Sequence, residues 1–185
     1  MPALDIVVED FELRGKRLGR LEVEAVNRVV QAGSASREWR LDRLSLRTAE
    51  AALSASGQWV ALGGAARRRM TMDFQLDLAD SGSYLERLGY GKTLRGGRGR
   101  LEGQLAWSGS PLAWDTKSLD GTMNLSLDAG QFLKVDAGAA RLLGVLSLQS
   151  LPRRLALDFR DVFQEGFAFD NIGGDFRLAA GIMHT

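Results

Sequence analysis

The chain has 185 residues, of which 45% are hydrophobic and 25% are charged, enough for one domain with a core of its own. Its net charge of +1 argues against nucleic acid as the main partner, because counterion-driven binding requires a strong basic excess. It contains no cysteine, which excludes a disulfide framework, a thiol nucleophile and a thiolate metal site.

Both ends of the sequence resemble the interior of a longer protein. Residues 1–5 have neither the basic nor the apolar region of a signal peptide. The longest strongly apolar stretch, Leu142–Leu148, is far shorter than the roughly 20 residues that cross a bilayer. The chain begins inside an alternating pattern and ends at Gly181–Thr185 without a closing element. We therefore expect residues 1–185 to be a single β-rich segment of a longer protein.

Alternation of apolar and polar residues, the pattern of a strand with one buried face, dominates the sequence. Weaker alternation predicts strands over Leu4–Leu13, Leu18–Val26, Trp39–Leu46, Leu53–Leu62, Gly166–Ile172 and Asp175–Leu178. The four clearest runs have their apolar residues at Met70, Met72, Phe74, Leu76 and Leu78; at Leu101, Leu105 and Trp107; at Leu119, Met123, Leu125 and Leu127; and at Leu155, Leu157 and Phe159. Turns are expected at the glycine pairs 63–64, 96–97 and 173–174.

In two strands the apolar phase flips midway, between Val8 and Phe11 and between Leu41 and Leu44. A β-bulge restores the facing side chains to one side, because it adds one residue to one strand of a pair. The sequence therefore predicts a bulge at each of these places.

Two short helices interrupt the strands. The first is predicted to have Ser83 as its N-cap, Glu86 three residues later in a capping box, and its end at Gly89. The second is predicted to begin at Asp136 and to stop before Pro152, and its apolar face includes Leu142, Leu143 and Leu146. Strands of seven to eleven residues joined by short polar turns are typical of an antiparallel meander. The expected fold is mainly β, a strongly curved antiparallel sheet that forms an open groove or a partly closed, barrel-like shape, with two short helices.

No residue pattern indicates catalysis. The one histidine, His184, lies at the end of the chain, where neither a catalytic triad nor a zinc site would place it. Gly91-Lys92-Thr93 resembles the end of a P-loop, but Glu86 stands where its first glycine belongs and the segment follows a helix. We expect no enzyme activity, no metal and no cofactor.

Two kinds of charged cluster have alternative interpretations. The carboxylates Asp158, Asp161, Asp170 and Asp175 could form a hydrolytic pair, but aspartates at turns and on polar strand faces explain them better. The basic clusters at residues 67–69 and 153–154 could bind lipid head-groups or phosphate, although solvated turns are the favoured interpretation.

The last part of the chain resembles a known family. The run from Ala140 to Leu155 leads into Leu157-Asp158-Phe159, then Gly166–Asp170, and closes with Ile172–Phe176. Earlier segments fit the same region: Ala55–Trp59, Leu88–Tyr90, Gly97–Gly99, Trp107–Pro111 and Ser118–Gly121. Together they resemble the C-terminal region of the YhdP branch of the AsmA-like family, most densely after about position 85.

The resemblance implies a periplasmic part of a large protein that an N-terminal helix, absent from this chain, anchors in the inner membrane of Gram-negative bacteria. Members resemble bridge-like lipid transporters: long curved sheets whose apolar groove shields phospholipid acyl chains between the inner and outer membranes and supports the outer-membrane barrier. Partners would be phospholipid acyl chains and membrane proteins at the ends of the full-length chain.

Residues expected to line such a groove are those on the apolar faces of the clearest strands. They are Met70, Met72, Phe74, Leu76, Leu101, Leu105, Trp107, Leu119, Met123, Leu125, Leu127, Leu155, Leu157 and Phe159. The second helix, through Leu142, Leu143 and Leu146, would cap or gate one end. Two alternatives stay open: a structural periplasmic scaffold or protein-interaction module with an ordinary closed core, and an outer-membrane barrel. The expected helices and the scattered tryptophans count against the barrel.

Overall fold

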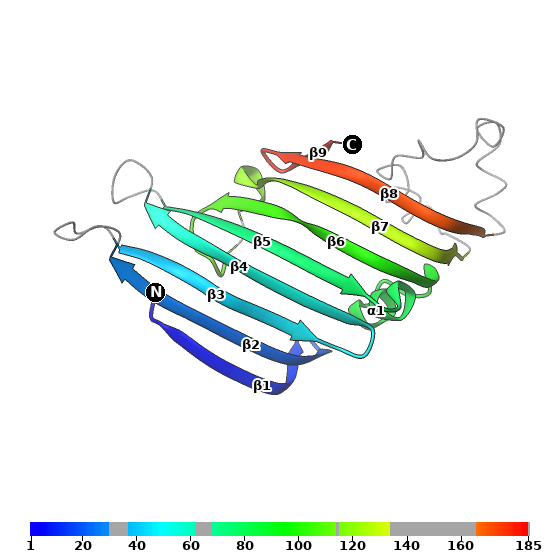
Figure 1. Cartoon of the computed structure of the whole chain (residues 1–185), viewed down its shortest axis with the longest axis horizontal. Helices are drawn as coiled ribbons and strands as arrows, with labels where there is room; N and C mark the ends of the chain where they lie inside the picture. Colours follow the sequence, from blue (N-terminus) through cyan, green and yellow to red (C-terminus); the bar gives the residue numbers. More distant parts are fainter. Residues whose placement is uncertain (30–36, 62–67, 114, 134–165, 185) are drawn as a thin grey trace.

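The computed structural model describes residues 1–29, 37–61, 68–113, 115–133 and 166–184, and these form one antiparallel sheet of nine strands (Figure 1). The strands are β1 (Leu4–Leu13), β2 (Lys16–Val29), β3 (Arg37–Arg47), β4 (Ala51–Ala61), β5 (Arg68–Leu78), β6 (Leu94–Ser108), β7 (Asp120–Phe132), β8 (Phe167–Ala179) and β9 (Ile182–His184). Each strand pairs with its neighbour in sequence, so the predicted antiparallel meander is confirmed. Because β1 and β9 form opposite ends of the strand order, the sheet is not closed.

One α-helix lies in the described part of the chain, α1 (Ser81–Leu88), together with a 3-10 helix, η1 (Thr116–Ser118). The predicted end of α1 at Gly89 is confirmed, and Gly89 adopts the left-handed conformation at φ 90° that glycine tolerates best. The prediction of Ser83 as N-cap is wrong. Asp80 caps the helix, because its carboxylate accepts hydrogen bonds from both the backbone N–H and the hydroxyl of Ser83.

Other expectations fall where the structure gives no description. The second helix, with Leu142, Leu143 and Leu146, and the strand with Leu155, Leu157 and Phe159 lie outside the described residues. Neither helix in the described part of the chain is long and apolar enough to cross a membrane.

Both predicted bulges are confirmed. The pairing of β1 with β2 shifts register between Val8 and Phe11, and that of β3 with β4 shifts between Leu41 and Leu44. In contrast, two glycine turns are wrong. Gly173 and Gly174 pair with Ser126 and Leu125 inside β8, because the polar and apolar faces continue through them without a change of phase. The pair 96–97 lies inside β6, where positive φ angles of 63° and 83° bend the strand without ending it.

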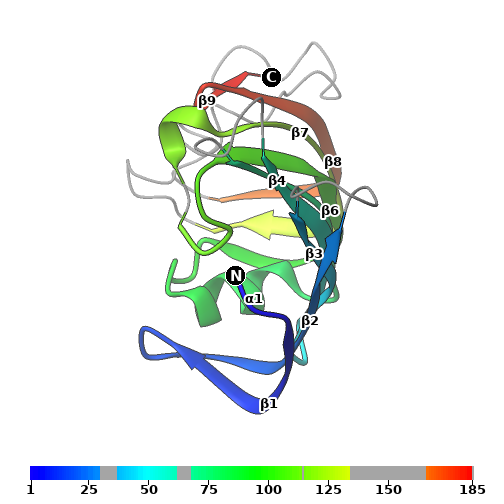
Figure 2. The same cartoon turned by 90° about the vertical axis from the view of Figure 1, so that its left-hand side faces the viewer.

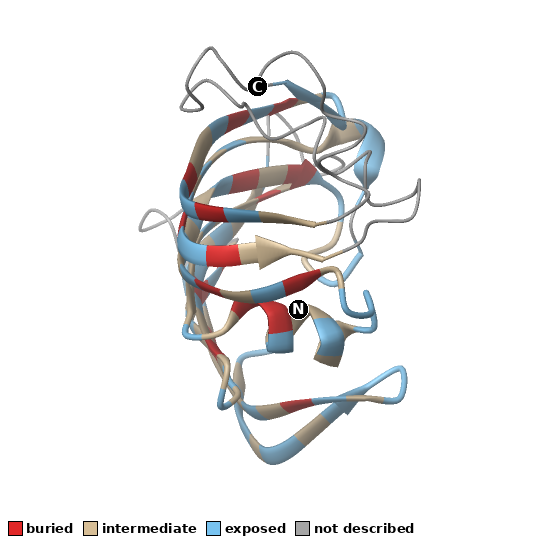
Figure 3. Cartoon of the chain, turned by 90° about the vertical axis from the view of Figure 1, so that its right-hand side faces the viewer, coloured by how far each residue is buried: buried red, intermediate tan, exposed pale blue. Residues whose placement is uncertain are grey.

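The register gives the sheet two chemically different faces. Across β4, β5 and β6, for example, Leu53 pairs with Leu76 and Leu76 with Leu101, while the intervening positions are polar. The helix α1 and the connection between β6 and β7 lie on the same side of the sheet (Figure 2). Burial alternates along the strands in the same way (Figure 3). We call the side that carries the leucines the apolar face and the other side the polar face.

Candidate functional site

The apolar face runs without interruption from β1 to β8, because the register aligns apolar residues in rows that cross the strands. One row, the tryptophan row, consists of Trp39, Trp59, Met70 and Trp107. A second, the leucine row, consists of Leu46, Leu53, Leu76, Leu101 and Leu125. Between them lies a row of Leu44, Ala55, Phe74, Gly103, Met123 and Phe176.

The tryptophan row closes one end of the apolar face. Trp107 and Trp39 are almost fully buried, at 1% and 3% exposure. Every indole N–H in the row donates to a backbone carbonyl: Trp39 to Pro2 at 2.8 Å, Trp59 to Gly109 at 2.6 Å and Trp107 to Ser110 at 2.9 Å. These bonds satisfy the polar end of each large side chain, as burial of an indole requires. They also fix the N-terminal segment and the connection between β6 and β7 against this end of the sheet.

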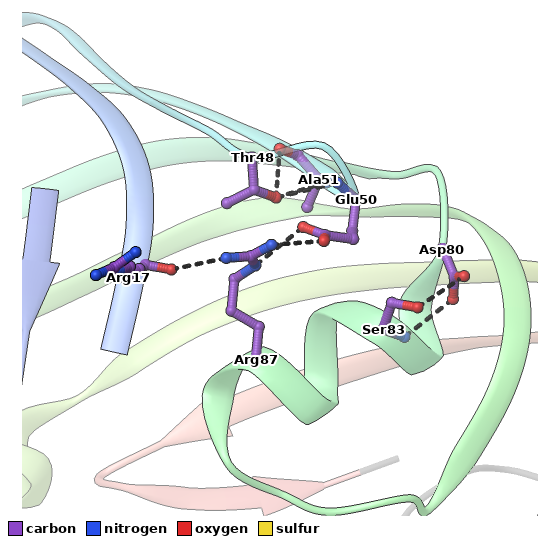
Figure 4. Close-up of polar contacts among 7 residues, drawn as sticks. All are labelled: Arg17, Thr48, Glu50, Ala51, Asp80, Ser83 and Arg87. Carbon is purple, nitrogen blue, oxygen red and sulfur yellow. Dashed lines mark hydrogen bonds and ion pairs between the residues drawn. The ribbon is translucent and has the colours of Figure 1, made fainter. Parts of the chain in front are cut away.

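The helix α1 closes the other end. Its Arg87 guanidinium donates to both carboxylate oxygens of Glu50, at 2.6 and 3.0 Å, and to the carbonyl of Arg17 at 3.2 Å (Figure 4). The buried Ser81 hydroxyl donates to the carbonyl of Gly97 at 2.8 Å. Beneath the helix, Leu85 packs against a cluster of buried residues, Leu94, Leu127, Phe169 and Ile172. The helix is therefore attached at both its ends and along its apolar side.

The Arg87–Glu50 ion pair at this end lowers the pKa of Glu50. Hydrogen bonds from Arg87 lower the pKa of Glu50 to about 2, against the opposing effect of partial burial, and the Thr48 hydroxyl adds to the lowering. Such a bidentate arginine–carboxylate pair combines charge with fixed geometry. The α1 end of the apolar face is therefore held by a charged contact, whereas the tryptophan end is held by neutral ones.

Between the two ends the apolar face is less completely covered. Among the described residues, Leu53, Leu76 and Leu101 of the leucine row are partly exposed and belong to neither of the two buried clusters. Met72, Phe74 and Met123 are also only partly buried. A strip of partly exposed apolar surface thus crosses the strands between the tryptophan row and α1.

Glycines lower the floor of this strip. A Cβ atom at Gly103 would collide with the backbone of Thr122 and Met123 on the neighbouring strand, and one at Gly57 would collide with the Thr71 carbonyl. Glycine at such positions permits a close approach of neighbouring backbones that any side chain would prevent. These glycines therefore bring neighbouring backbones close together beside Met72 and Phe74, their strand partners.

Hydrogen-bonded pairs of side chains connect the strands across the polar face. Five of them join neighbouring strands: Arg43–Glu24, Arg100–Asp77, Gln104–Asp73, Asn124–Asp175 and Asn171–Asp128, at 2.6 to 2.9 Å. A sixth, Arg69–Asp120 at 2.7 Å, reaches from β5 across β6 to β7. Hydrogen bonds from Gln75 and from Arg100 lower the pKa of Asp77 below its usual value. No group of three or more residues able to hold a metal ion occurs within the described ranges. This arrangement suits a solvated outer surface.

The sequence-predicted lining residues come together on one face as far as they are described. The register places on the same side the alternate residues Met70, Met72, Phe74 and Leu76, then Leu101, Leu105 and Trp107, and then Met123, Leu125 and Leu127. Leu119 lies at the end of η1 and packs against the cluster around Trp107. Sequence reasoning missed the Arg87–Glu50 pair, since 37 residues separate its members and neither belongs to a motif.

An open, one-layered antiparallel sheet with one apolar and one polar face defines a class of protein that offers a long apolar surface instead of a closed core. The family model described as YhdP protein matches residues 1–185, and the chain therefore belongs to the YhdP family. It is 32% identical over 134 residues to the intermembrane phospholipid transporter YhdP of Escherichia coli (strain K12). That match covers 72% of this chain and 10% of the relative. No solved structure matches the chain.

Proposed function

We propose that this chain is a segment of a bridge-like phospholipid transporter, in which the apolar face shields acyl chains between the inner and outer membranes. The observation that carries the proposal is the apolar strip across the strands, bounded by the tryptophan row and α1 and left partly exposed between them. Family membership and the relative's phospholipid transport support it.

The chemistry of the strip suits a conduit. Each CH₂ group of an acyl chain that leaves water gains about 0.8 kcal/mol. The strip offers leucine, methionine and phenylalanine side chains, which resemble the bilayer interior, so a chain enters without being trapped. Methionines at positions 70, 72 and 123 adapt to variable ligands because their side chains are flexible and polarizable.

The direction of the groove follows from its boundaries. Because the tryptophan row and α1 lie at opposite ends of the strands, the groove between them runs across the strands, parallel to the strand order. The glycines at 57 and 103 would let the sheet curve around a lipid, since they bring neighbouring backbones together on the apolar side. The lining then includes Met70, Met72, Phe74, Leu76, Leu101, Leu105, Trp107, Leu119, Met123, Leu125 and Leu127.

We also propose where in the cell envelope the segment lies. The segment belongs to the periplasmic part of an inner-membrane-anchored protein in the Gram-negative envelope, contributes to the outer-membrane barrier, and is not an enzyme. Its partners are phospholipid acyl chains, with membrane proteins at the ends of the full-length chain.

Photo-crosslinking at adjacent positions tests the proposal. Leu76 and Gln75 are neighbours on β5, both are partly exposed, and they face opposite sides of the sheet. A photoreactive residue at Leu76, but not at Gln75, is expected to form adducts with phospholipid after incubation with vesicles. The pair Leu125 and Ser126 provides a replicate on β7. Adducts at neither position in a folded chain would contradict the conduit and favour the structural scaffold.

A further inference from the structure

Arg68 and Arg69, the two described members of the basic cluster at residues 67–69, lie on opposite faces of the sheet. Arg69 lies on the polar face, where its guanidinium donates to the Asp120 carboxylate at 2.7 Å. Arg68 alternates with Met70 and Met72 along β5 and therefore belongs to the apolar face. Its guanidinium carbon lies over the ring of Trp59, 4.3 Å from the centroid. Two adjacent arginines thus have different surroundings.

Arg68 has no counter-charge among the described residues. Among the described residues no carboxylate pairs with it, whereas Arg69 beside it is paired. The described carboxylates at this end of the sheet lie elsewhere: Asp120 accepts from Arg69 and from the Ala180 N–H, and Asp115 accepts from the Lys117 N–H. Glu38, next to Trp39 on β3, alternates onto the polar face.

The surroundings of Arg68 hold it in place. Trp59 is fixed by its hydrogen bond to the Gly109 carbonyl and by its place in the tryptophan row. Stacking of a guanidinium on an indole is favourable, because the cation lies over the negative face of the ring. Stacking uses the planar surface of the guanidinium, so the N–H groups at its edge can still donate hydrogen bonds to a ligand. An arginine held in this way has the planar fork that recognises phosphate with two parallel hydrogen bonds.

We infer that Arg68, stacked on Trp59, binds the phosphate of a phospholipid whose acyl chains lie in the apolar groove. This inference rests on the proposed function and deepens it, since it assigns the head-group to the tryptophan end. An indole with one apolar side and one polar edge suits the boundary between acyl chain and head-group. Among the described side chains that alternate onto the apolar face of β5, Arg68 alone is charged.

The test compares Arg68→Gln with Arg69→Gln in the 185-residue chain. Each protein is incubated with phosphatidylethanolamine and phosphatidylglycerol vesicles or, separately, with diacylglycerol dispersions, re-isolated, and analysed for bound lipid by mass spectrometry. We expect Arg68→Gln to lower phospholipid binding about tenfold, the loss typical of a charged hydrogen-bonded contact. Binding of diacylglycerol, which has the same chains and no phosphate, is expected to stay unchanged. Arg69→Gln serves as the matched control and is expected to bind both lipids normally.

Other outcomes separate this inference from the proposed function. If Arg68→Gln binds phospholipid as the unaltered chain does, the head-group assignment is overturned and the conduit stands. If the unaltered chain takes up neither lipid, both proposals fail. Arg68-dependent binding of inorganic phosphate as tight as that of phospholipid would overturn the head-group as the ligand. Arg68→Lys, which keeps the charge and loses the fork, is expected to bind at an intermediate level, and circular dichroism checks that every variant is folded.

Discussion

The two ends of the apolar face are closed by different interactions. At one end three indoles donate to backbone carbonyls, and two of these indoles are nearly fully buried. At the other end the Arg87–Glu50 ion pair helps to hold α1, a helix of eight residues, over the buried cluster around Leu94 and Leu127. The comparison teaches that the tryptophan end depends on buried area, which is insensitive to pH and salt, whereas the α1 end depends partly on charge. The following substitutions test that difference, from the largest expected effect to the smallest.

Truncation of the tryptophan end should cost most. Trp107→Ala is expected to lower the free energy of unfolding by about 3–5 kcal/mol, because it removes a fully buried aromatic side chain and leaves a cavity. Urea denaturation followed by circular dichroism measures this loss. Trp59→Ala should cost less, since Trp59 is only partly buried. Equal losses at the two positions would contradict the assignment of Trp107 to the centre of this cluster.

A side chain added at Gly103, between the two ends, should reduce stability less than removal of a core tryptophan does. Gly103→Val is expected to destabilise the sheet by about 1–3 kcal/mol, since the new side chain collides with the backbone at Thr122 and Met123. Gly173→Val is the control, because a Cβ there meets only the Leu125 carbonyl, at 3.3 Å. Thermal unfolding of both variants distinguishes the positions. Similar midpoints for both would show that close approach at Gly103 is unimportant.

The α1 end should be the part that responds to acid. Glu50→Gln is expected to lower stability by about 1 kcal/mol at neutral pH, through loss of the charged pair with Arg87. Because folding lowers the pKa of Glu50 from 4.5 to about 2, the pair contributes fully above pH 4.5. Its contribution is lost as the pH falls from 4.5 towards 2. The difference in thermal midpoint between the two proteins should therefore shrink across this range, and a constant difference would contradict the ionic attachment.

The polar face should be the least sensitive region. Arg100→Gln is expected to change stability by less than about 0.5 kcal/mol, because the Arg100–Asp77 pair is roughly half exposed on both sides. Added salt should reduce even this difference. Chemical denaturation at low and high salt measures both effects. A loss as large as that of Glu50→Gln would mean that the cross-strand pairs, and not the ends of the apolar face, hold the sheet together.

Much of the sheet could be predicted from the sequence because one local rule governs it. Alternation identified the strands and the faces, and its two failures of phase located the bulges at Val8–Phe11 and Leu41–Leu44. A different signal misled at Gly173-Gly174: glycine composition suggested a turn, although the alternation of faces continues through both residues. The N-cap was misplaced because Asp80 and Ser83 are both good capping residues, and only the backbone conformation at Asp80 decides between them.

The candidate site was predictable in part for the same reason. The apolar residues of the lining are visible in each strand, but their order across the sheet depends on register, which no single strand reveals. The tryptophan row unites positions 39, 59 and 107, and the indole bonds reach backbone carbonyls that carry no sequence signal. Likewise, the run of adjacent arginines at 67–69 does not show which of them lies on the apolar face. That distinction follows from the alternation of β5 and from the position of Trp59.

Because every strand pairs with its neighbours in sequence, the order of the strands affects how such a sheet can be lengthened in evolution. In a closed sheet the number of strands and their stagger must satisfy a geometric condition, so a hairpin cannot be added without altering the whole. Here each strand needs only its two neighbours in sequence, and no condition links β1 with β9. Duplication of a hairpin would therefore lengthen the sheet by one step and leave every existing pairing intact. The length of the sheet can therefore change in evolution by one hairpin at a time.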